Sequence, residues 1–149
     1  MTEAEARELA TWAYPPPFDV YDSGDAALFL RRDPDGGGYY PVLDDDGRLI
    51  AFAVVGAEAR VRGQEPAPGV VDVGMGIRPD ATSRGLGSAL VGHVLALAGE
   101  LTGATTARAA VAASNERSLA LCRAAGFRDV RTFAGPGDRP FVELVRRLP

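Results

Sequence analysis

The sequence contains no lysine, so all 16 of its basic residues are arginines. This absence excludes catalysis through a lysine Schiff base or a lysine nucleophile. Cysteine and histidine each occur once, as Cys122 and His93. One cysteine cannot form an internal disulfide, and this pair cannot supply the four ligands of a usual zinc site. We therefore expect no metal ion and no disulfide framework.

The chain also lacks an excess of basic residues and any long apolar run. Its formal net charge is −4 and its pI is about 5.0, which argues against the clustered basic surface of a nucleic-acid-binding protein. No stretch approaches the length of a membrane span, and the first residues do not follow the basic-then-apolar order of a secretion signal. We therefore expect a cytoplasmic protein with no nucleic-acid and no membrane partner.

The residues that are present predict one globular domain covering residues 1–149. A hydrophobic content of 46% and a charged content of 24% are ordinary for such a domain. Hairpin signals favour antiparallel strands in the first half, and strand–helix–strand units favour parallel pairing in the second. The predicted fold class is α/β (α+β), with a mixed central sheet of about six to seven strands flanked by helices. We expect helices over residues 3–12, 24–31, 84–102 and 115–125, and strands over residues 39–43, 49–57, 70–77, 106–112, 127–133 and 141–148.

The segment SRGLGSAL, residues 83–90, lies where a strand is expected to end and a helix to begin. A helix N-terminus has unpaired N–H groups and a partial positive charge, so it binds phosphate when its backbone can be approached closely. Two glycines and two small residues permit that approach, and an arginine adds a cation. The segment fits a diphosphate site, although the glycines also fit a tight turn with close packing. The residues of this candidate site are Arg84, Gly85, Leu86, Gly87, Ser88 and Ala89.

The pattern R-x-x-G-x-A over residues 84–89 resembles the pyrophosphate loop of the GNAT superfamily of N-acetyltransferases. The strand end MGIRP, residues 75–79, and Asn115 followed by a helix and Gly-Phe at 126–127 resemble the same superfamily. The resemblance implies a GNAT-type fold, acetyl-CoA as co-substrate, and direct transfer of an acetyl or longer acyl group to a primary amine of a small molecule or peptide. The alternatives are a CoA-binding sensor or partner subunit that has lost catalysis, and a structural protein that binds no CoA.

The third expected strand has two unlike faces, because side chains alternate along a strand. One face is apolar, and the other carries Asp72, Gly74 and Gly76. The resemblance implies that the pantetheine arm of CoA pairs with backbone groups around Met75 and Ile77, and the glycines leave room nearby. Packing of the glycines against a helix is the alternative.

Two residues are candidates for proton transfer. Asp72 lies on an otherwise apolar strand, where burial raises the pKa of a carboxyl toward that of a general base. An ion pair with an arginine, or a carboxylate held by backbone N–H groups, are the alternatives. Cys122 stands seven residues after Asn115, where many members of the superfamily have a tyrosine. It could serve as the general acid, fill apolar space, or leave the thiolate to water. Asn115 can cap its helix, and the resemblance implies that it also contacts the CoA arm.

The aromatic, proline-rich segment after the first helix is expected to form the acceptor wall, because in the superfamily the first helices and their loop cover the acceptor. Tyr14, Phe18 and Tyr21 would line an apolar pocket there, or else cap the core under a proline-rich turn. The loop over residues 62–69 and the hairpin tip near Gly135 could close over the same site. Pairing of edge strands into a homodimer is left open.

Overall fold

A mixed sheet of six strands forms the frame of the computed structural model, which describes residues 1–16, 24–82 and 85–149. The strands lie in the order β1–β2–β3–β4–β6–β5, and all neighbours are antiparallel except β3 and β4. The predicted α/β fold with a mixed sheet is confirmed. The strands are β1 (Gly38–Leu43), β2 (Leu49–Val55), β3 (Val70–Ile77), β4 (Thr106–Ala112), β5 (Arg128–Ala134) and β6 (Pro140–Arg147).

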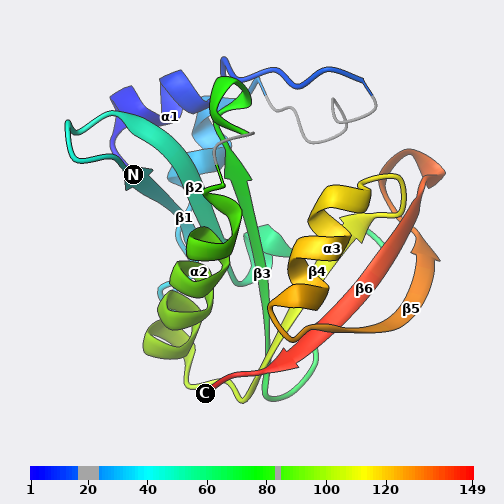
Figure 1. The fold of residues 1–149 in the computed structure, drawn as a ribbon. Coiled ribbons are helices and arrows are strands. Elements are labelled where there is room, and N and C mark those ends of the chain that lie inside the picture. Colours follow the sequence, from blue (N-terminus) through cyan, green and yellow to red (C-terminus); the bar gives the residue numbers. More distant parts are fainter. Residues whose placement is uncertain (17–23, 83–84) are drawn as a thin grey trace.

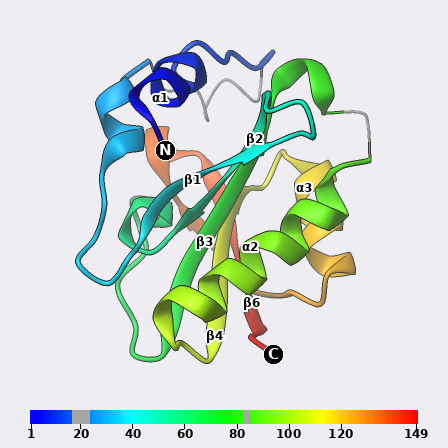
Figure 2. The same ribbon diagram turned by 90° about the vertical axis from the view of Figure 1, so that its left-hand side faces the viewer.

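Helices cover both faces of the sheet. α2 (Gly87–Thr102) and α3 (Glu116–Ala124) lie on one face, and α1 (Glu3–Leu9) with the 3-10 helix η2 (Ala26–Leu30) lies on the other (Figures 1 and 2). Two apolar clusters correspond to these two layers. As the alternation predicts, the odd-numbered side chains of β3 all belong to the cluster under α2 and α3: Val71, Val73, Met75 and Ile77.

α1 begins as the sequence predicts and ends earlier. The Thr2 hydroxyl accepts from the Glu5 N–H while the Glu5 carboxylate accepts from the Thr2 N–H, which is the reciprocal pair of a capping box. The helix was expected to reach Trp12 but ends at Leu9, because the last N–H groups, including that of Trp12, bond to carbonyls only three residues back. Trp12 is nonetheless buried, in the cluster that joins α1 to the sheet.

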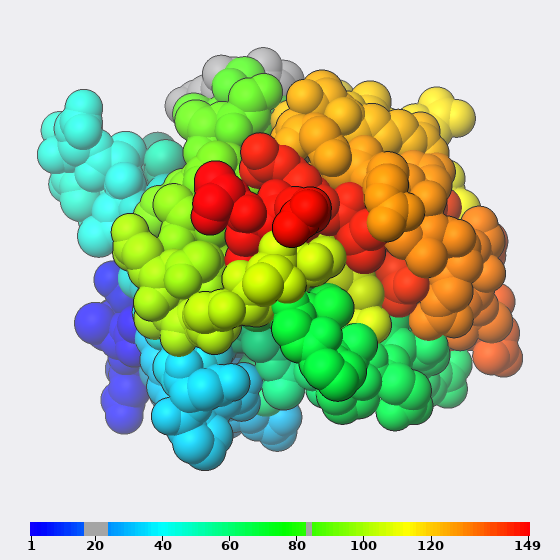
Figure 3. Space-filling view, turned by 90° about the horizontal axis from the view of Figure 1, so that it is seen from below, coloured from blue at the N-terminus to red at the C-terminus, as the bar shows by residue number. Residues whose placement is uncertain are grey.

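β3 and β4 are paired at one end only. Their parallel register joins residues 70–72 to residues 106–108, and no further pair follows among the described residues. Beyond this point the two strands diverge (Figure 1). At the paired end, the C-terminal residues lie between α2 and β5 (Figure 3), and the Leu148 N–H donates to the Thr105 carbonyl at 2.9 Å. The line between β3 and β4, which we call the seam, is therefore covered at one end and open at the end where β3 stops.

Candidate functional site

Backbone groups of β3 face the open part of the seam. The Gly56 N–H donates to the Asp72 carbonyl and the Arg78 N–H donates to the Ile50 carbonyl, both at 2.8 Å, and the register between these bonds is continuous. Even-numbered residues of β3 therefore turn their N–H and C=O groups toward β2, and odd-numbered residues turn theirs toward β4. Because β4 is no longer paired with β3 at Met75, this residue presents both its N–H and its C=O group to the seam.

Tyr14, predicted to line the acceptor pocket, lies at the open end of the seam. Its hydroxyl donates to the Ile77 carbonyl at 2.8 Å. This bond fills one acceptor position of a carbonyl that the resemblance assigned to the CoA arm, so Met75 is left as the better placed of the two predicted backbone partners. Phe18 and Tyr21 lie outside the described residues.

Phe52 of β2 is a neighbour of this site that sequence reasoning missed. It is partly exposed, and its ring centre lies 6.3 Å from that of Trp12. A Cβ at Gly76 would overlap this ring, and a Cβ at Gly74 would lie 2.9 Å from Cγ1 of Val54. The glycines of β3 thus make room for side chains of β2 rather than for a helix. The β2–β3 register places Phe52 opposite Gly76, and that long-range register is not visible in the sequence.

α2 begins at Gly87 without a side-chain cap. Its first helical bond runs from the Leu90 N–H to the Leu86 carbonyl at 3.0 Å. The N–H groups of the residues before Leu90 therefore have no acceptor within the helix. Gly85 adopts a φ of 73°, a left-handed conformation that glycine takes without strain. The predicted anion site therefore has the helix N-terminus and the glycine turn that it needs.

The second glycine of the loop also serves packing. A Cβ at Gly87 would lie 2.8 Å from Cδ2 of Leu121 on α3, so the close-packing alternative holds for this residue. Ser88 and Ala89, by contrast, have exposed side chains. A substitution at Ser88 consequently probes the helix terminus without disturbing the contact between α2 and α3. Arg84 lies outside the described residues.

Asn115 caps α3 as predicted. Its Oδ1 accepts from the Ser118 N–H at 3.2 Å. Two residues further, Arg117 donates from Nη1 to the Thr82 carbonyl at 3.3 Å, which ties the start of α3 to the segment that leads into the candidate loop. The N-termini of α2 and α3 therefore lie at the end of the molecule where β3 stops (Figure 1).

Asp72 is buried and held by two arginines. Arg108 donates from Nε to Oδ1 at 2.6 Å and from Nη2 to Oδ2 at 3.1 Å, and Arg60 donates from Nε to Oδ2 at 2.9 Å. The Asp72 side chain is 3% exposed. The structure thus has the ion-pair alternative, with guanidinium groups on both carboxylate oxygens. Because a general base must reach the proton it abstracts, the role of Asp72 as a base stays a prediction.

Asp72 belongs to a row of alternating charges that crosses four strands. It lies opposite Arg108, and Glu143 of β6 lies opposite Arg131 of β5. Arg108 Nη1 is 3.8 Å from Glu143 Oε1, and Arg131 donates from Nε to Glu143 Oε2 at 3.1 Å. We call these four residues the charged row. Sequence reasoning found only Asp72, although an arginine inside the small apolar strand TARAAVA carries the same signal.

Acid should weaken the fold through Glu143. Burial raises its pKa, but hydrogen bonds from Arg131 and Gln64 outweigh burial, and the pKa of Glu143 lies below its usual range. Such a carboxyl stabilises the fold above its unfolded pKa, and this stabilisation is lost as the pH falls through the folded pKa. We expect the wild type to lose more free energy of unfolding between about pH 5 and pH 3 than Glu143→Gln does. Urea titrations across this range measure the loss, and an equal loss in both proteins would contradict the assignment.

Cys122 lies on the core side of α3. Its side chain is 8% exposed and packs in the cluster under α2 and α3. Burial raises the pKa of the Cys122 thiol from an ordinary value of 9.0 to about 11. Transfer of a proton from Cys122 to an ordinary thiolate is therefore uphill. Apolar packing agrees with this burial, and the role of Cys122 as a general acid stays a prediction.

We expect Cys122 to react slowly with thiol reagents while the protein is folded. At about pH 8 the raised pKa leaves roughly 0.1% thiolate, against roughly 10% for the ordinary value of 9.0, so the reaction should be about a hundredfold slower. Labelling with Ellman's reagent, with and without denaturing guanidinium chloride, measures the ratio. Equally fast labelling of the folded protein would show that the thiol is accessible and activated.

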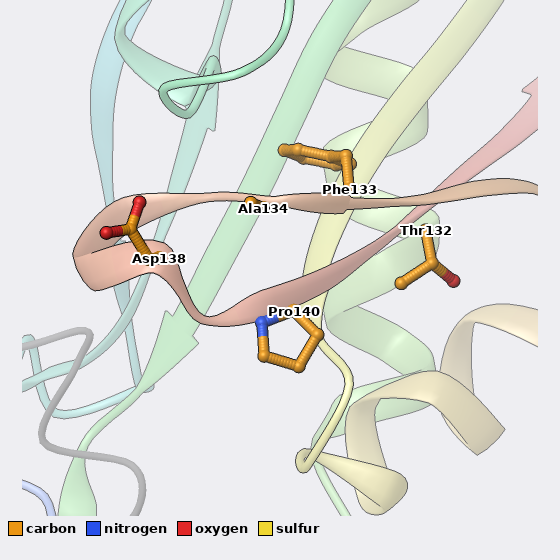
Figure 4. A pocket seen from close by; sticks show the side chains of 5 residues that line it. All are labelled: Thr132, Phe133, Ala134, Asp138 and Pro140. Carbon is orange, nitrogen blue, oxygen red and sulfur yellow. The ribbon is translucent and has the colours of Figure 1, made fainter.

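A shallow pocket lies on the β5–β6 hairpin (Figure 4). Phe133 points to the opposite side of the hairpin from Thr132 and Pro140, as alternation along a strand requires. None of the residues predicted for the site lines this pocket, so it adds nothing to the seam. The lining residues are Thr132, Phe133, Ala134, Asp138 and Pro140.

Across residues 1–16, 24–82 and 85–149, no group of three or more His, Cys, Asp or Glu side chains is placed to bind a metal ion. No helix within the same ranges has the length and apolar character needed to cross a bilayer.

Comparison with known proteins points to one family. The profile of the acetyltransferase (GNAT) family matches residues 4–127. The aminoglycoside acetyltransferase AAC(6′)-Ib in complex with coenzyme A has a TM-score of 0.77 at 22% identity, covering 99% of this chain and 91% of that one. The phosphinothricin acetyltransferase of Sinorhizobium meliloti in complex with AcCoA has a TM-score of 0.75 at 20% identity, covering 99% and 85%. At these identities the likeness shows the fold. No curated protein matches the chain significantly.

Proposed function

The chain belongs to the acetyltransferase (GNAT) family, and we propose that it transfers an acetyl group from acetyl-CoA to a primary amine of a small molecule or peptide. The open seam between β3 and β4 is the observation that carries this proposal. A strand whose backbone groups have lost their neighbour lets an extended ligand arm pair as an added strand. The seam opens at the end where α2 begins, and a helix N-terminus suits a diphosphate.

Residues of this chain would hold acetyl-CoA along that path. The backbone of Met75 pairs with the pantetheine arm, and the N–H groups of Gly87, Ser88 and Ala89 bind the diphosphate. Asn115 lies at the same end of the molecule and contacts the arm. Acetyl-CoA supplies the acetyl group as a thioester. The protein contributes position, which lowers the entropic part of the barrier, and an N–H group of β3 that faces the seam can polarise the thioester carbonyl.

The amine that attacks the thioester must lose a proton to an acceptor, and neither predicted side chain is well placed for proton transfer. Asp72 is enclosed by guanidinium groups, and Cys122 is a weak, buried acid. We infer that water at the open end of the seam takes the proton from the amine and returns one to the departing CoA thiolate. The alternative, Asp72 as the base, requires a loss of about 10²-fold or more in kcat when its carboxylate is removed from a protein that still folds.

The test is the release of free CoA from acetyl-CoA in the presence of a panel of primary amines. Release that depends on the amine, with an acetylated product of matching mass, supports the proposal. Binding of acetyl-CoA by calorimetry without release for any amine would favour the CoA-binding sensor instead. Absence of binding would contradict both the enzyme and the sensor, and the glycines of the loop would then serve only a tight turn.

A further inference from the structure

A loop over residues 60–65 crosses the face of the sheet opposite α2 and α3, and we call it the strap. It follows the 3-10 helix η3 (Ala57–Ala59) and lies behind the sheet in the view of Figure 1. Hydrogen bonds hold it to the sheet from end to end. Three bonds of 3.1 Å or less are donated by the strap: Arg60 Nε to Asp72 Oδ2 at 2.9 Å, Arg62 Nη2 to the Gly135 carbonyl at 3.0 Å, and Gln64 Nε2 to Glu143 Oε1 at 3.1 Å. Two are accepted by strap carbonyls: Gly63 from Arg131 Nη2 at 3.0 Å, and Glu65 from Arg108 Nη2 at 2.7 Å.

Four of these five bonds end on the charged row, so the strap and the row depend on each other. The side chains of Arg108 and Glu143 are 9% and 7% exposed, and Gln64 is 6% exposed. Lifting the strap would remove hydrogen-bond partners from buried charged groups, which costs more than losing bonds at the surface. The strap is therefore a fixed part of the fold and not a mobile flap.

Gly63 presses the strap against the β5–β6 hairpin. Its φ is 103°, and a Cβ there would lie 2.7 Å from Cδ2 of Phe133 and 2.9 Å from the Ala134 carbonyl oxygen. A side chain at this position would both strain the backbone and push the strap away from the hairpin. The strap is thus held to the sheet in two ways: Gly63 permits close contact with the hairpin at its middle, and charged groups pair along its length.

The strap decides which part of the sheet face an acceptor can use. α1 and η2 cover β1 and β2, and the strap covers β4, β6 and β5. The strip of β3 that carries Gly74 and Gly76 lies between these covers, with Phe52 and Tyr14 beside it. Among the described residues, this strip is the part of the sheet face left between the two covers, and we infer that an amine reaches the seam through it.

We propose that the strap is a fixed specificity wall, which confines the acceptor to the strip over β3 and selects a compact amine over a peptide laid across β4 and β6. This inference rests on the proposed function, since it names the acceptor class of the same site. It assigns Gly63 and Gln64 as positioning residues of that wall.

Gly63→Ala tests the wall, and Gly47→Ala is its matched control. Gly47 also has a left-handed φ, of 79°, but lies in the β1–β2 turn with nothing within 4 Å of an added Cβ. The first readout is trypsin, which can cut this lysine-free chain only after arginine and would meet Arg60 and Arg62 in the strap. The second is kcat/KM for propylamine and for a short peptide that carries its primary amine on a side chain at its middle. Both reactions are followed by CoA release.

We expect the wild type and Gly47→Ala to resist cleavage in the strap and to prefer propylamine. Gly63→Ala should be cut there at least about tenfold faster, and its peptide-to-propylamine ratio of kcat/KM should rise about tenfold. If Gly63→Ala does not fold, Arg62→Ala, which frees the hairpin tip from the strap, takes its place. Rapid strap cleavage in the wild type, or an unchanged ratio in a variant whose strap is cut, would overturn the wall. Absence of CoA release from the wild type with either amine is a failure of the proposed function, and the trypsin result remains separate from it.

Discussion

Ser88→Glu is expected to abolish most of the stabilisation that acetyl-CoA gives to the folded protein. The residue lies in the first turn of α2 with an exposed side chain, among the N–H groups that have no acceptor within the helix. A carboxylate a few ångströms from a bound diphosphate costs about 4 kcal/mol at an effective dielectric constant of about 20. We therefore expect Kd to rise on the order of a hundredfold or more. A ligand present at about 100 times its Kd stabilises the fold by about 2.7 kcal/mol, and this falls to about 0.4 kcal/mol when Kd reaches the ligand concentration.

Thermal unfolding with and without acetyl-CoA measures this change. For a domain of this size the wild-type shift should be roughly 5–10 °C, and the shift of the variant should be near the error of the method. The unliganded variant should melt like the wild type, because an acidic residue in the first turn of a helix is favourable. That property makes Ser88 a cleaner probe than Gly87, where any side chain would collide with Leu121.

Two controls separate charge at the terminus from other effects. Ser88→Gln has nearly the size of the glutamate without its charge and should keep most of the ligand shift. Ala96→Glu places the same charge at an exposed position of α2, about 12 Å along the helix axis, and should keep the shift at physiological ionic strength. A full ligand-induced Tm shift in Ser88→Glu, or an equal loss of that shift in Ala96→Glu, would show that the diphosphate does not bind at this loop.

The strands of the fold could be predicted closely because their signals are local. β3 and β4 begin and end at the residues that alternation and the flanking turns indicate, and Asn115 caps α3 as its position suggests. The first helix was predicted too long, because an apolar stripe continues to Trp12 while the backbone bonds have already tightened to three-residue spacing. Side-chain periodicity reports which residues are buried, and Trp12 is buried without being helical.

The candidate site was only half predictable for a related reason. The loop and the helix terminus are contiguous in sequence, so their pattern could be found by spacing. The partners of Asp72 come from two other segments, and a single sequence does not tell which arginine reaches a buried carboxylate. The strap shows the same limit, since its bonds join residues 60–65 to β3, β4, β5 and β6, and the last three of these strands follow much later in the chain. Long-range pairing of charges must be read from the fold.

Arg108→Met should lower the free energy of unfolding by about 3–5 kcal/mol, because it leaves the buried Asp72 carboxylate with one guanidinium partner in place of two. The corresponding fall in Tm is roughly 10–15 °C for a domain of this size. Arg123→Met is the matched control. Arg123 also pairs with a carboxylate, Asp129 at 2.7 Å, but its side chain is 51% exposed, and exposed pairs contribute at most about 1 kcal/mol. Equal melting of the two variants would show that the charged row does not hold the sheet together.

Asp72→Leu combined with Arg108→Met extends this test from stability to chemistry. Removing both partners should destabilise the protein less than the sum of the two single changes, because neither charge is left buried without the other. If the folded double variant keeps kcat within about threefold, Asp72 serves the fold and water carries the proton, as proposed. A fall of about 10²-fold or more with unchanged acetyl-CoA binding would instead make Asp72 the base. The same carboxylate cannot be freed for proton transfer without loosening Arg60 at the start of the strap. A base role would therefore require the acceptor wall to move during turnover, which trypsin sensitivity measured with and without acetyl-CoA would reveal.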